Sequence, residues 1–223
     1  MWGTLPPSRM LPARYALGSS DICFTNRLAS TFFSLGRVLP THRLHKSRLG
    51  GLFQPTLDLL PALLSPPSSA WVHVFPEGRV HQHPAPLHQM RYFKWGISRL
   101  ILEPAVAPVL MPMFIAGFEH IMPEPRGFPQ FLPRLGKHLC VVYGDAVPDA
   151  RFEDVRQQWN RLWLREGGGP VGQSDVLRTG EEAVRLRIET TRRVREEVVK
   201  LRRTLGYPDE EPGADDPATY LDP

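Results

Sequence analysis

The chain has 223 residues, which is enough for one domain with a core and a tail. Its formal charge of +4 and pI near 9.3 suit an anionic partner, either nucleic acid or a membrane surface. Two cysteines exclude a disulfide framework, and no Cys/His spacing typical of zinc occurs. The longest charge-free apolar run has 15 residues, including three prolines. A bilayer-spanning helix needs about 20 apolar residues, so none is predicted.

The N-terminal part is predicted to be irregular and then helical. Residues 1–20 contain Pro6, Pro7, Pro12 and Gly18, which break regular structure. A short helix is predicted within residues 21–39, capped by Asp21 or Thr25 and ending near Gly36.

The middle of the chain alternates between helical and strand patterns. A helix is predicted over 54–64 and another over 89–103, where apolar residues recur at helical spacing. Residues 71–75 form a β-branched and aromatic run that Pro76 stops, and 106–115 and 139–143 are further strand candidates. Strands that alternate with helices predict an α/β fold.

The C-terminal part is predicted to contain two helices and a tail. One helix follows Asp154, and residues 166–180, with three consecutive glycines, read as a flexible linker. Residues 181–205 predict a basic amphipathic helix, which could lie on anionic lipid or pack against the domain. The acidic, Pro/Gly-rich residues 206–223 are expected to be disordered.

Two loops carry candidate functional residues. Phe75-Pro76-Glu77-Gly78 places a carboxylate after a strand, where α/β folds bind ligands, although a surface turn has the same pattern. Arg43 follows Pro40-Thr41-His42 in a basic loop, and its planar guanidinium suits a phosphate. A merely solvated loop is the alternative for this second segment.

These features occur together in an order that resembles the glycerolipid and lysophospholipid acyltransferases, and within them the tafazzin family. The similarity covers residues 14–165. The matching blocks are Asp21-Ile22-Cys23-Phe24-Thr25, Phe32-Phe33-Ser34-Leu35-Gly36-Arg37-Val38 running to Arg43, Trp71-Val72-His73-Val74-Phe75-Pro76-Glu77-Gly78-Arg79-Val80, Phe93-Lys94-Trp95-Gly96-Ile97-Ser98-Arg99-Leu100-Ile101, and Val109-Leu110-Met111-Pro112.

The resemblance implies a glycerol-3-phosphate acyltransferase-like fold, with a mixed sheet flanked by helices. It implies exchange of acyl chains between phospholipids and lysophospholipids, remodelling cardiolipin from monolysocardiolipin without coenzyme A. Such proteins are held in one leaflet of the inner and outer mitochondrial membranes, on the intermembrane-space side. Here the apolar segment 106–118 could dip into a leaflet, but an interior strand is equally apolar.

The resemblance also implies roles for single residues. Arg43 contacts the lipid phosphate, Glu77 helps to hold the acyl acceptor, and Gly78 gives clearance. The implied substrate-binding residues are Arg43, Phe75, Pro76, Glu77 and Gly78, and the implied acyl-pocket residues are Val109, Leu110 and Pro112.

One family motif is missing from the chain. Family catalysis needs H-x-x-x-x-D, in which the histidine is the general base and the aspartate orients it. None of the eight histidines stands five residues before an aspartate, and none precedes Asp21. We therefore expect no catalytic residue here, an incomplete acyltransferase domain over 21–165 that lacks its N-terminal part, and a shortened form of a longer enzyme. A His73 or His42 substitute base is the less favoured reading.

Two other function classes remain open. The first is a catalytically inactive lipid-binding or membrane-associated protein, which the missing motif favours. The second is a nucleic-acid binder, for which the sequence has only its pI and no zinc-finger, RNP or GXXG pattern. No nucleic-acid partner is expected.

Overall fold

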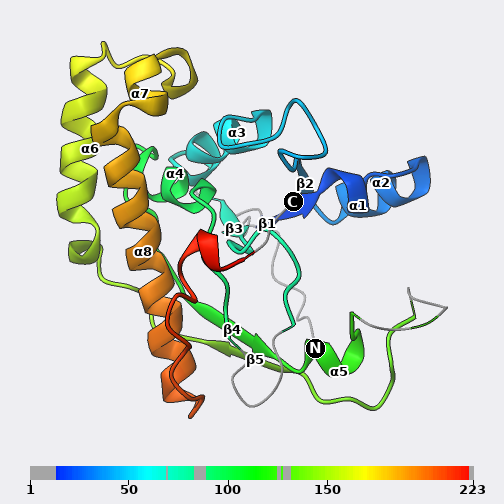
Figure 1. Ribbon diagram of the computed structural model, residues 1–223. Coiled ribbons are helices and arrows are strands. Elements are labelled where there is room, and N and C mark those ends of the chain that lie inside the picture. The colour runs from blue at the N-terminus through cyan, green and yellow to red at the C-terminus, as the bar shows by residue number, and fades with distance from the viewer. Residues whose placement is uncertain (1–13, 69, 83–88, 125–126, 128–131, 221–223) are drawn as a thin grey trace.

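A small parallel sheet organises the N-terminal half of the molecule. The computed structural model describes residues 14–68, 70–82, 89–124, 127 and 132–220 (Figure 1). The central strand β1 (Arg14–Ser19) pairs in parallel with β2 (Val38–Thr41) and β3 (Trp71–His73), giving the order β2-β1-β3. Because the strands are parallel, their carboxyl ends, and the loops that follow them, lie at one edge of the sheet.

Helices connect the parallel strands, since parallel neighbours need a crossover rather than a hairpin. Two helices, α1 (Ser20–Cys23) and α2 (Arg27–Leu35), join β1 to β2, and α3 (Pro55–Leu64) leads from β2 to β3. The Asn26 side chain caps α2 by accepting a hydrogen bond from the backbone N–H of Ala29 at 2.9 Å.

A second sheet consists of two antiparallel strands. Strand β4 (Met113–Ala116) pairs with β5 (Cys140–Tyr143), and Met113 faces Tyr143 in the register. Helix α4 (Gly96–Leu102) precedes β4, and the short α5 (Phe118–Ile121) follows it. The strand predicted over 106–115 is shorter than expected because prolines interrupt its first half.

The remaining helices form a layer on one side of the molecule. They are α6 (Glu153–Arg165), α7 (Asp175–Thr179) and α8 (Glu181–Thr204), with 3₁₀ turns at Asp149–Arg151, Val171–Gln173 and Pro217–Thr219. In Figure 1 this layer lies at the opposite end of the molecule from α1 and α2.

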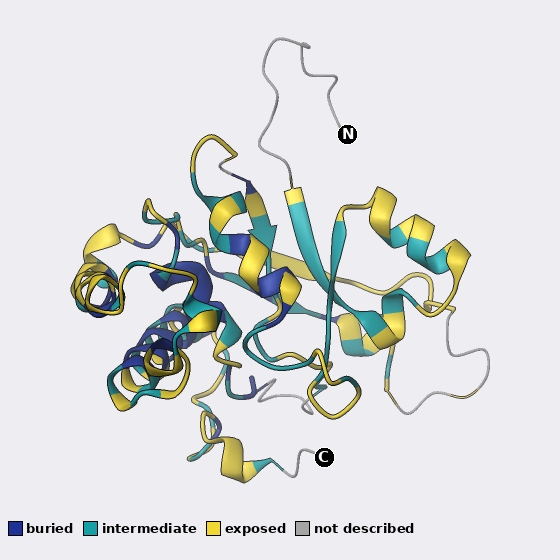
Figure 2. Cartoon of the chain, turned by 90° about the horizontal axis from the view of Figure 1, so that it is seen from above, coloured by how far each residue is buried: buried dark blue, intermediate teal, exposed yellow. Residues whose placement is uncertain are grey.

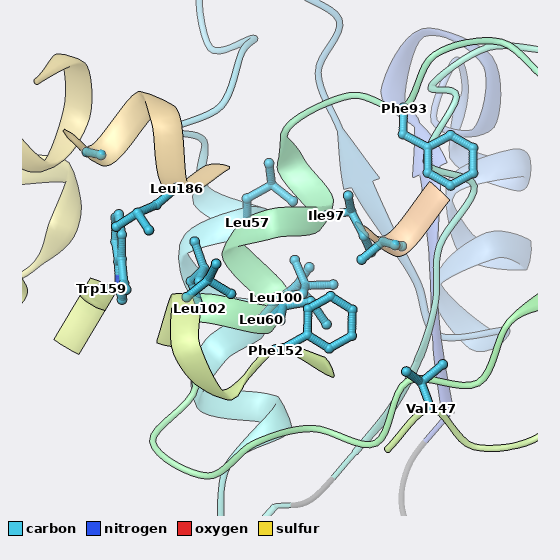
Figure 3. Close-up of a cluster of buried hydrophobic side chains, with 14 of the residues drawn as sticks. Leu57, Leu60, Phe93, Ile97, Leu100, Leu102, Val147, Phe152, Trp159 and Leu186 are labelled. Atoms are coloured by element: carbon cyan, nitrogen blue, oxygen red, sulfur yellow. The ribbon is translucent and has the colours of Figure 1, made fainter. Parts of the chain in front are cut away.

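The hydrophobic core lies where α3, α4, α6 and α8 meet (Figure 3). Leu60 of α3, Leu102 of α4, Trp159 of α6 and Leu186 of α8 are at most 2% exposed. Figure 2 shows the buried residues concentrated in these helices, whereas α1 and α2 carry none. The stable centre is therefore helical, and the parallel sheet lies at its side.

The predicted α/β class is confirmed: a parallel sheet is flanked by helices. The resemblance implied a mixed sheet, and among the described residues the parallel and antiparallel pairings lie in two separate sheets. Helix α8 packs against α4, α6 and α7, so packing against the domain, not lipid contact, accounts for its inner face. The folded unit thus continues beyond residue 165.

The expectation of an irregular N-terminus is wrong for residues 14–19, which form β1. Gly18 reads as a breaker in the sequence, but in β1 it allows close packing: a Cβ there would lie 2.6 Å from Val38 Cγ1 and 3.0 Å from Cys23 Sγ. Residues 1–13 lie outside the described part of the chain.

The expected linker and tail are also more ordered than the sequence indicates. The linker over 166–180 contains α7, whose Leu177 is 1% exposed. In the tail, Glu210 forms an ion pair with Arg195 at 2.9 Å, and Ala214 is buried. The glycines of the linker and the acidic residues of the tail indicate disorder in the sequence. The contacts that order these segments come from residues elsewhere in the chain. Residues 221–223 lie outside the described part.

Within the described residues, no helix is both long and apolar enough to cross a bilayer.

Candidate functional site at the carboxyl edge of the parallel sheet

The loops that follow β2 and β3 carry the sequence-predicted substrate-binding residues, Arg43 and residues 75–78, and leave the sheet at the same edge. Asp21 lies just after β1 and Arg43 just after β2, and their strands end opposite each other in the register, Ser19 with Thr41. The chain continues from the end of β3 to Glu77. We refer to this region as the sheet-edge site.

Arg43 and Asp21 form an ion pair at the sheet-edge site. Arg43 Nε donates to Asp21 Oδ1 at 3.1 Å, and its Nη2 donates to Oδ2. Hydrogen bonds from Arg43 and then from the Ser19 hydroxyl lower the pKa of Asp21 to about 2. Asp21 is therefore ionised at neutral pH and fixes the guanidinium.

This pairing leaves part of the Arg43 guanidinium available for a phosphate. Arginine has five N–H donors, and no described group accepts a hydrogen bond from Arg43 Nη1. Both side chains remain 30% exposed. The Gln54 side chain fixes the loop that carries Arg43. It accepts a hydrogen bond from the backbone N–H of His42 at 2.7 Å and donates one to the Gly51 carbonyl at 2.6 Å.

Glu77 is held in a setting that disfavours its charge. Its Oε2 accepts a hydrogen bond from the backbone N–H of Arg91 at 3.0 Å. Burial raises the pKa of Glu77, while the Arg91 hydrogen bond and the positive charges of Arg195 and Arg91 act in the opposite direction. A carboxyl with a raised pKa can accept or donate a hydrogen bond to a hydroxyl group.

The turn around Glu77 is fixed by backbone hydrogen bonds. The N–H of Gly78 donates to the Phe75 carbonyl at 3.1 Å, and the N–H of Lys94 donates to the Pro76 carbonyl at 2.7 Å. Gly78 has φ +70°, and a Cβ there would lie 3.0 Å from Lys94 Cγ. Here the glycine accommodates the turn and Lys94. The Phe75 ring is 56% exposed beside them.

The sequence did not reveal the residues that hold the Met90–Arg91 backbone, to which Glu77 is hydrogen-bonded. Arg195 of α8 donates from Nε to the Arg91 carbonyl and from Nη2 to the Met90 carbonyl, both at 3.0 Å. Glu210 pairs with Arg195 at 2.9 Å and accepts from the N–H of Met90 at 3.1 Å. The C-terminal segment and α8 thus hold the strip of backbone that binds Glu77.

Sequence comparisons identify curated relatives of the chain. The chain is 36% identical to tafazzin of Saccharomyces cerevisiae over 255 aligned positions, which cover 99% of this chain and 67% of the yeast protein. The chain belongs to the tafazzin family. It is also 35% identical to N-acylphosphatidylethanolamine synthase of Arabidopsis thaliana, covering 66% of the chain and 50% of that protein, and 30% identical to tafazzin of Drosophila melanogaster, covering 88% and 48%.

This tafazzin-family chain spans about two thirds of the yeast relative and about half of the other two. No protein-family profile matches it.

The implied acyl-pocket residues lie away from the parallel sheet, in the segment that enters β4. Val109 is 71% exposed, and Pro112 is buried beside Gly144, whose N–H donates to its carbonyl at 2.9 Å. Leu110 lines a cavity of ≈ 10 Å³, about the size of one water molecule. That cavity does not accommodate an acyl chain. The structure therefore does not show these three residues lining an acyl pocket beside Arg43 and Glu77.

Two histidines near the sheet-edge site have structural contacts. His73 packs its ring on Phe75 with centroids 4.5 Å apart, and its Nε2 is buried without a hydrogen-bond partner among the described residues. Burial, and then the charge of Arg14, lower the pKa of His73. His42 Nδ1 lies 3.0 Å from Ser20 Oγ. Among the residues that the structure describes, no carboxylate contacts either ring to orient it as a base.

A larger groove lies in the helical layer. It has a volume of ≈ 660 Å³ between α6, α7 and α8, and its lining includes the apolar Val184 and Ile188 and the charged Arg185, Glu189 and Asp154. None of the sequence-predicted site residues lines it. Among the described residues, no group of three or more His, Cys, Asp and Glu side chains gathers as metal ligands would.

Proposed function

We propose that this chain is a phospholipid–lysophospholipid acyltransferase of the tafazzin type that remodels the acyl chains of cardiolipin. The observation that carries the proposal is that Arg43 and Glu77 lie in loops that leave the carboxyl ends of two strands of one parallel sheet. A guanidinium with a free donor suits the lipid phosphate, and a partly buried carboxyl suits the acceptor hydroxyl. The names of the relatives, tafazzin and N-acylphosphatidylethanolamine synthase, support the same class.

In the proposed reaction the hydroxyl oxygen of a lysophospholipid attacks the ester carbonyl of a phospholipid. The ester bond of the donor breaks, its glycerol oxygen leaves with the proton that the acceptor loses, and the acyl chain is esterified to the acceptor. The donor is itself an ester, so no coenzyme A is needed. Monolysocardiolipin is the proposed acceptor, and the protein is proposed to act peripherally on the inner and outer mitochondrial membranes, facing the intermembrane space.

A second candidate is a catalytically inactive lipid-binding protein. It is favoured by one observation: no histidine in the chain stands five residues before an aspartate, although the attacking hydroxyl needs a general base. In that case Arg43 and Glu77 bind the lysophospholipid but no transfer follows.

The test is acyl transfer from labelled phosphatidylcholine to monolysocardiolipin in liposomes by the 223-residue chain. Circular dichroism and liposome flotation show whether each variant is folded and bound. The site variants are Glu77→Gln and Arg43→Gln, and the controls are Glu153→Gln and Arg161→Gln, whose side chains are exposed on α6. Transfer that the site variants lose and the controls keep supports the transacylase, whereas a folded, bound chain without transfer supports the second candidate.

A further inference from the structure

Helix α2 carries an apolar face that the rest of the described chain leaves uncovered. Leu28, Phe32 and Leu35 recur at intervals of four and three residues, so they share one side of the helix. They are 85%, 70% and 81% exposed. The opposite side packs inward, where the Phe33 ring lies 6.3 Å from that of Phe24.

Three more apolar side chains of the neighbouring segments are exposed. Ile22 of α1 is 60% exposed, and Leu44 and Leu49, in the loop after β2, are 76% and 57% exposed. We call the six side chains together the docking face. Figure 1 shows α1 and α2 projecting at the end of the molecule opposite α6, α7 and α8. The docking face comprises Ile22, Leu28, Phe32, Leu35, Leu44 and Leu49.

The charges around the docking face are almost all positive. Residues 20–50 contain five Lys/Arg and one acidic residue, Asp21, which is already paired with Arg43. The formal charge of this segment equals that of the whole chain, +4, so the other residues balance to zero. The basic side chains at 27, 37, 46 and 48 of this segment are exposed, as the apolar ones are.

We propose that the docking face inserts into the interfacial region of an anionic phospholipid bilayer. Apolar side chains on a short amphipathic helix enter the boundary between head groups and acyl chains, and each Lys/Arg near an anionic surface adds about 1 kcal/mol. The inference rests on the proposed function in that the substrates are lipids of that bilayer. It assigns membrane contact to 22–49 in place of the segments 106–118 and 181–205 that the sequence suggested.

The charge distribution decides between a bilayer and a second copy of the chain. A symmetric dimer through the docking face would bring two basic segments against each other, which is unfavourable. An anionic bilayer offers the complementary charge together with an apolar interior.

Docking in this way brings the sheet-edge site to the membrane surface. Helix α1 begins directly after β1 with Asp21 in its first turn, and Leu44 directly follows Arg43. When Leu44 and Ile22 enter the bilayer, the Arg43 guanidinium therefore lies at the level of the lipid phosphates. The bilayer then presents head groups to Arg43 without the lipid leaving the leaflet.

The experiment is flotation of the full 223-residue chain with vesicles of phosphatidylcholine alone or with cardiolipin added. The apolar variant is Leu28→Gln/Phe32→Gln/Leu35→Gln. Its control is Leu164→Gln/Val176→Gln/Ile188→Gln, three exposed apolar residues of the helical layer. A charge variant, Arg37→Gln/Lys46→Gln/Arg48→Gln, tests the electrostatic part. Circular dichroism and sedimentation velocity report folding and oligomeric state.

We expect the apolar and charge variants each to lose at least about tenfold in partitioning onto cardiolipin vesicles while the control binds as the unmodified chain does. Wild-type-like binding by the apolar variant, or an equal loss in the control, would overturn the proposal. A dimer that the apolar variant converts to a monomer would assign the face to a second copy. The assay contains no acyl acceptor, so it gives its answer whether or not the chain transfers acyl groups.

Discussion

Glu77 combines a candidate role in acceptor binding with a cost to the folded state. Burial raises its pKa, although the Arg91 N–H and the positive charge of Arg195 favour its ionised form. A group whose pKa is higher in the folded than in the unfolded state stabilises the fold below its unfolded pKa. That contribution is lost as the pH rises through the folded pKa.

We therefore predict that Glu77→Gln stabilises the fold relative to the unmodified chain, and more so at about pH 7 than at about pH 4. The ordinary pKa of 4.5 marks the start of this window. Glutamine keeps an oxygen that can accept the Arg91 N–H, so the hydrogen bond at 3.0 Å is retained. Thermal unfolding of both proteins at the two pH values measures the difference. A difference in Tm that does not change with pH would contradict this view of Glu77.

The Arg43–Asp21 pair gives the opposite pH dependence. Asp21 has its pKa lowered to about 2 from 3.8, chiefly by the Arg43 hydrogen bonds. Its contribution to stability is present above the ordinary pKa and disappears as the pH falls toward about 2. Because the pair is partly exposed, we expect at most about 1 kcal/mol from it.

In Arg43→Gln the pKa of Asp21 should rise toward its ordinary value of 3.8. A carboxyl ¹³C NMR titration of Asp21 measures the change, and Arg161→Gln serves as the control. An unchanged pKa of Asp21 in Arg43→Gln would mean that the pair does not form in solution.

At this scale the sequence predicted Arg43 and Glu77 but not their supports. The two residues belong to short blocks with a recognisable order. Arg195 and Glu210 are far away in the chain, and Arg195 reads as one more charge on a basic helix. Only the packing of α8 against the 90–91 backbone shows that these residues hold Glu77 in place.

At the scale of elements, α8 shows where periodicity succeeds and where it fails. Its predicted range, 181–205, agrees with Glu181–Thr204. The buried face differs from the predicted apolar stripe: Ile188 is 47% exposed, whereas Arg187 and Arg202 are fully buried. Arg187 donates to the carbonyls of Leu177 and Arg178. A pattern of apolar residues cannot identify buried arginines whose guanidinium groups donate to backbone carbonyls outside their own helix.

The first predicted helix is split for a local reason. It forms as α1 and α2, separated at Phe24, and Asn26 rather than Asp21 or Thr25 caps α2. Asp21 lies inside α1, where its carboxylate accepts hydrogen bonds from Arg43 and Ser19, so it is not placed at the start of α2. The pattern of residues 21–39 did not reveal this break between two helices.

Arg195 provides the prediction at this scale. Its side chain and that of Glu210 are each 10% exposed, so Arg195→Met leaves a buried carboxylate without its cation. We expect a loss of about 3–5 kcal/mol in the free energy of unfolding, measured by urea denaturation. Arg185→Gln, on the exposed side of α8, should change it by no more than about 0.5 kcal/mol.

A double variant separates the ion pair from simple packing. Arg195→Met combined with Glu210→Gln should be less destabilised than the sum of the single changes, because no unpaired charge remains. Additive losses would show that the two side chains act independently.

At the scale of the whole molecule, the proposed sites and the buried core occupy different sides. The helical core of α3, α4, α6 and α8 carries most of the buried side chains, while the parallel sheet, α1 and α2 present the sheet-edge site and the docking face. The sequence predicted the α/β class but not this division, since exposure of Leu28, Phe32 and Leu35 depends on what packs around α2. A groove of ≈ 660 Å³ on the helical side offers a competing location for a ligand.

Hydrogen–deuterium exchange with and without cardiolipin vesicles that contain monolysocardiolipin tests the location of function most directly. We predict slower exchange in residues 20–50 and 71–82, which carry Arg43, Glu77 and the docking face, and unchanged exchange in α6 and α8. Protection confined to residues 153–165 and 181–204, around the helical groove, would contradict the assignment of function to the sheet edge.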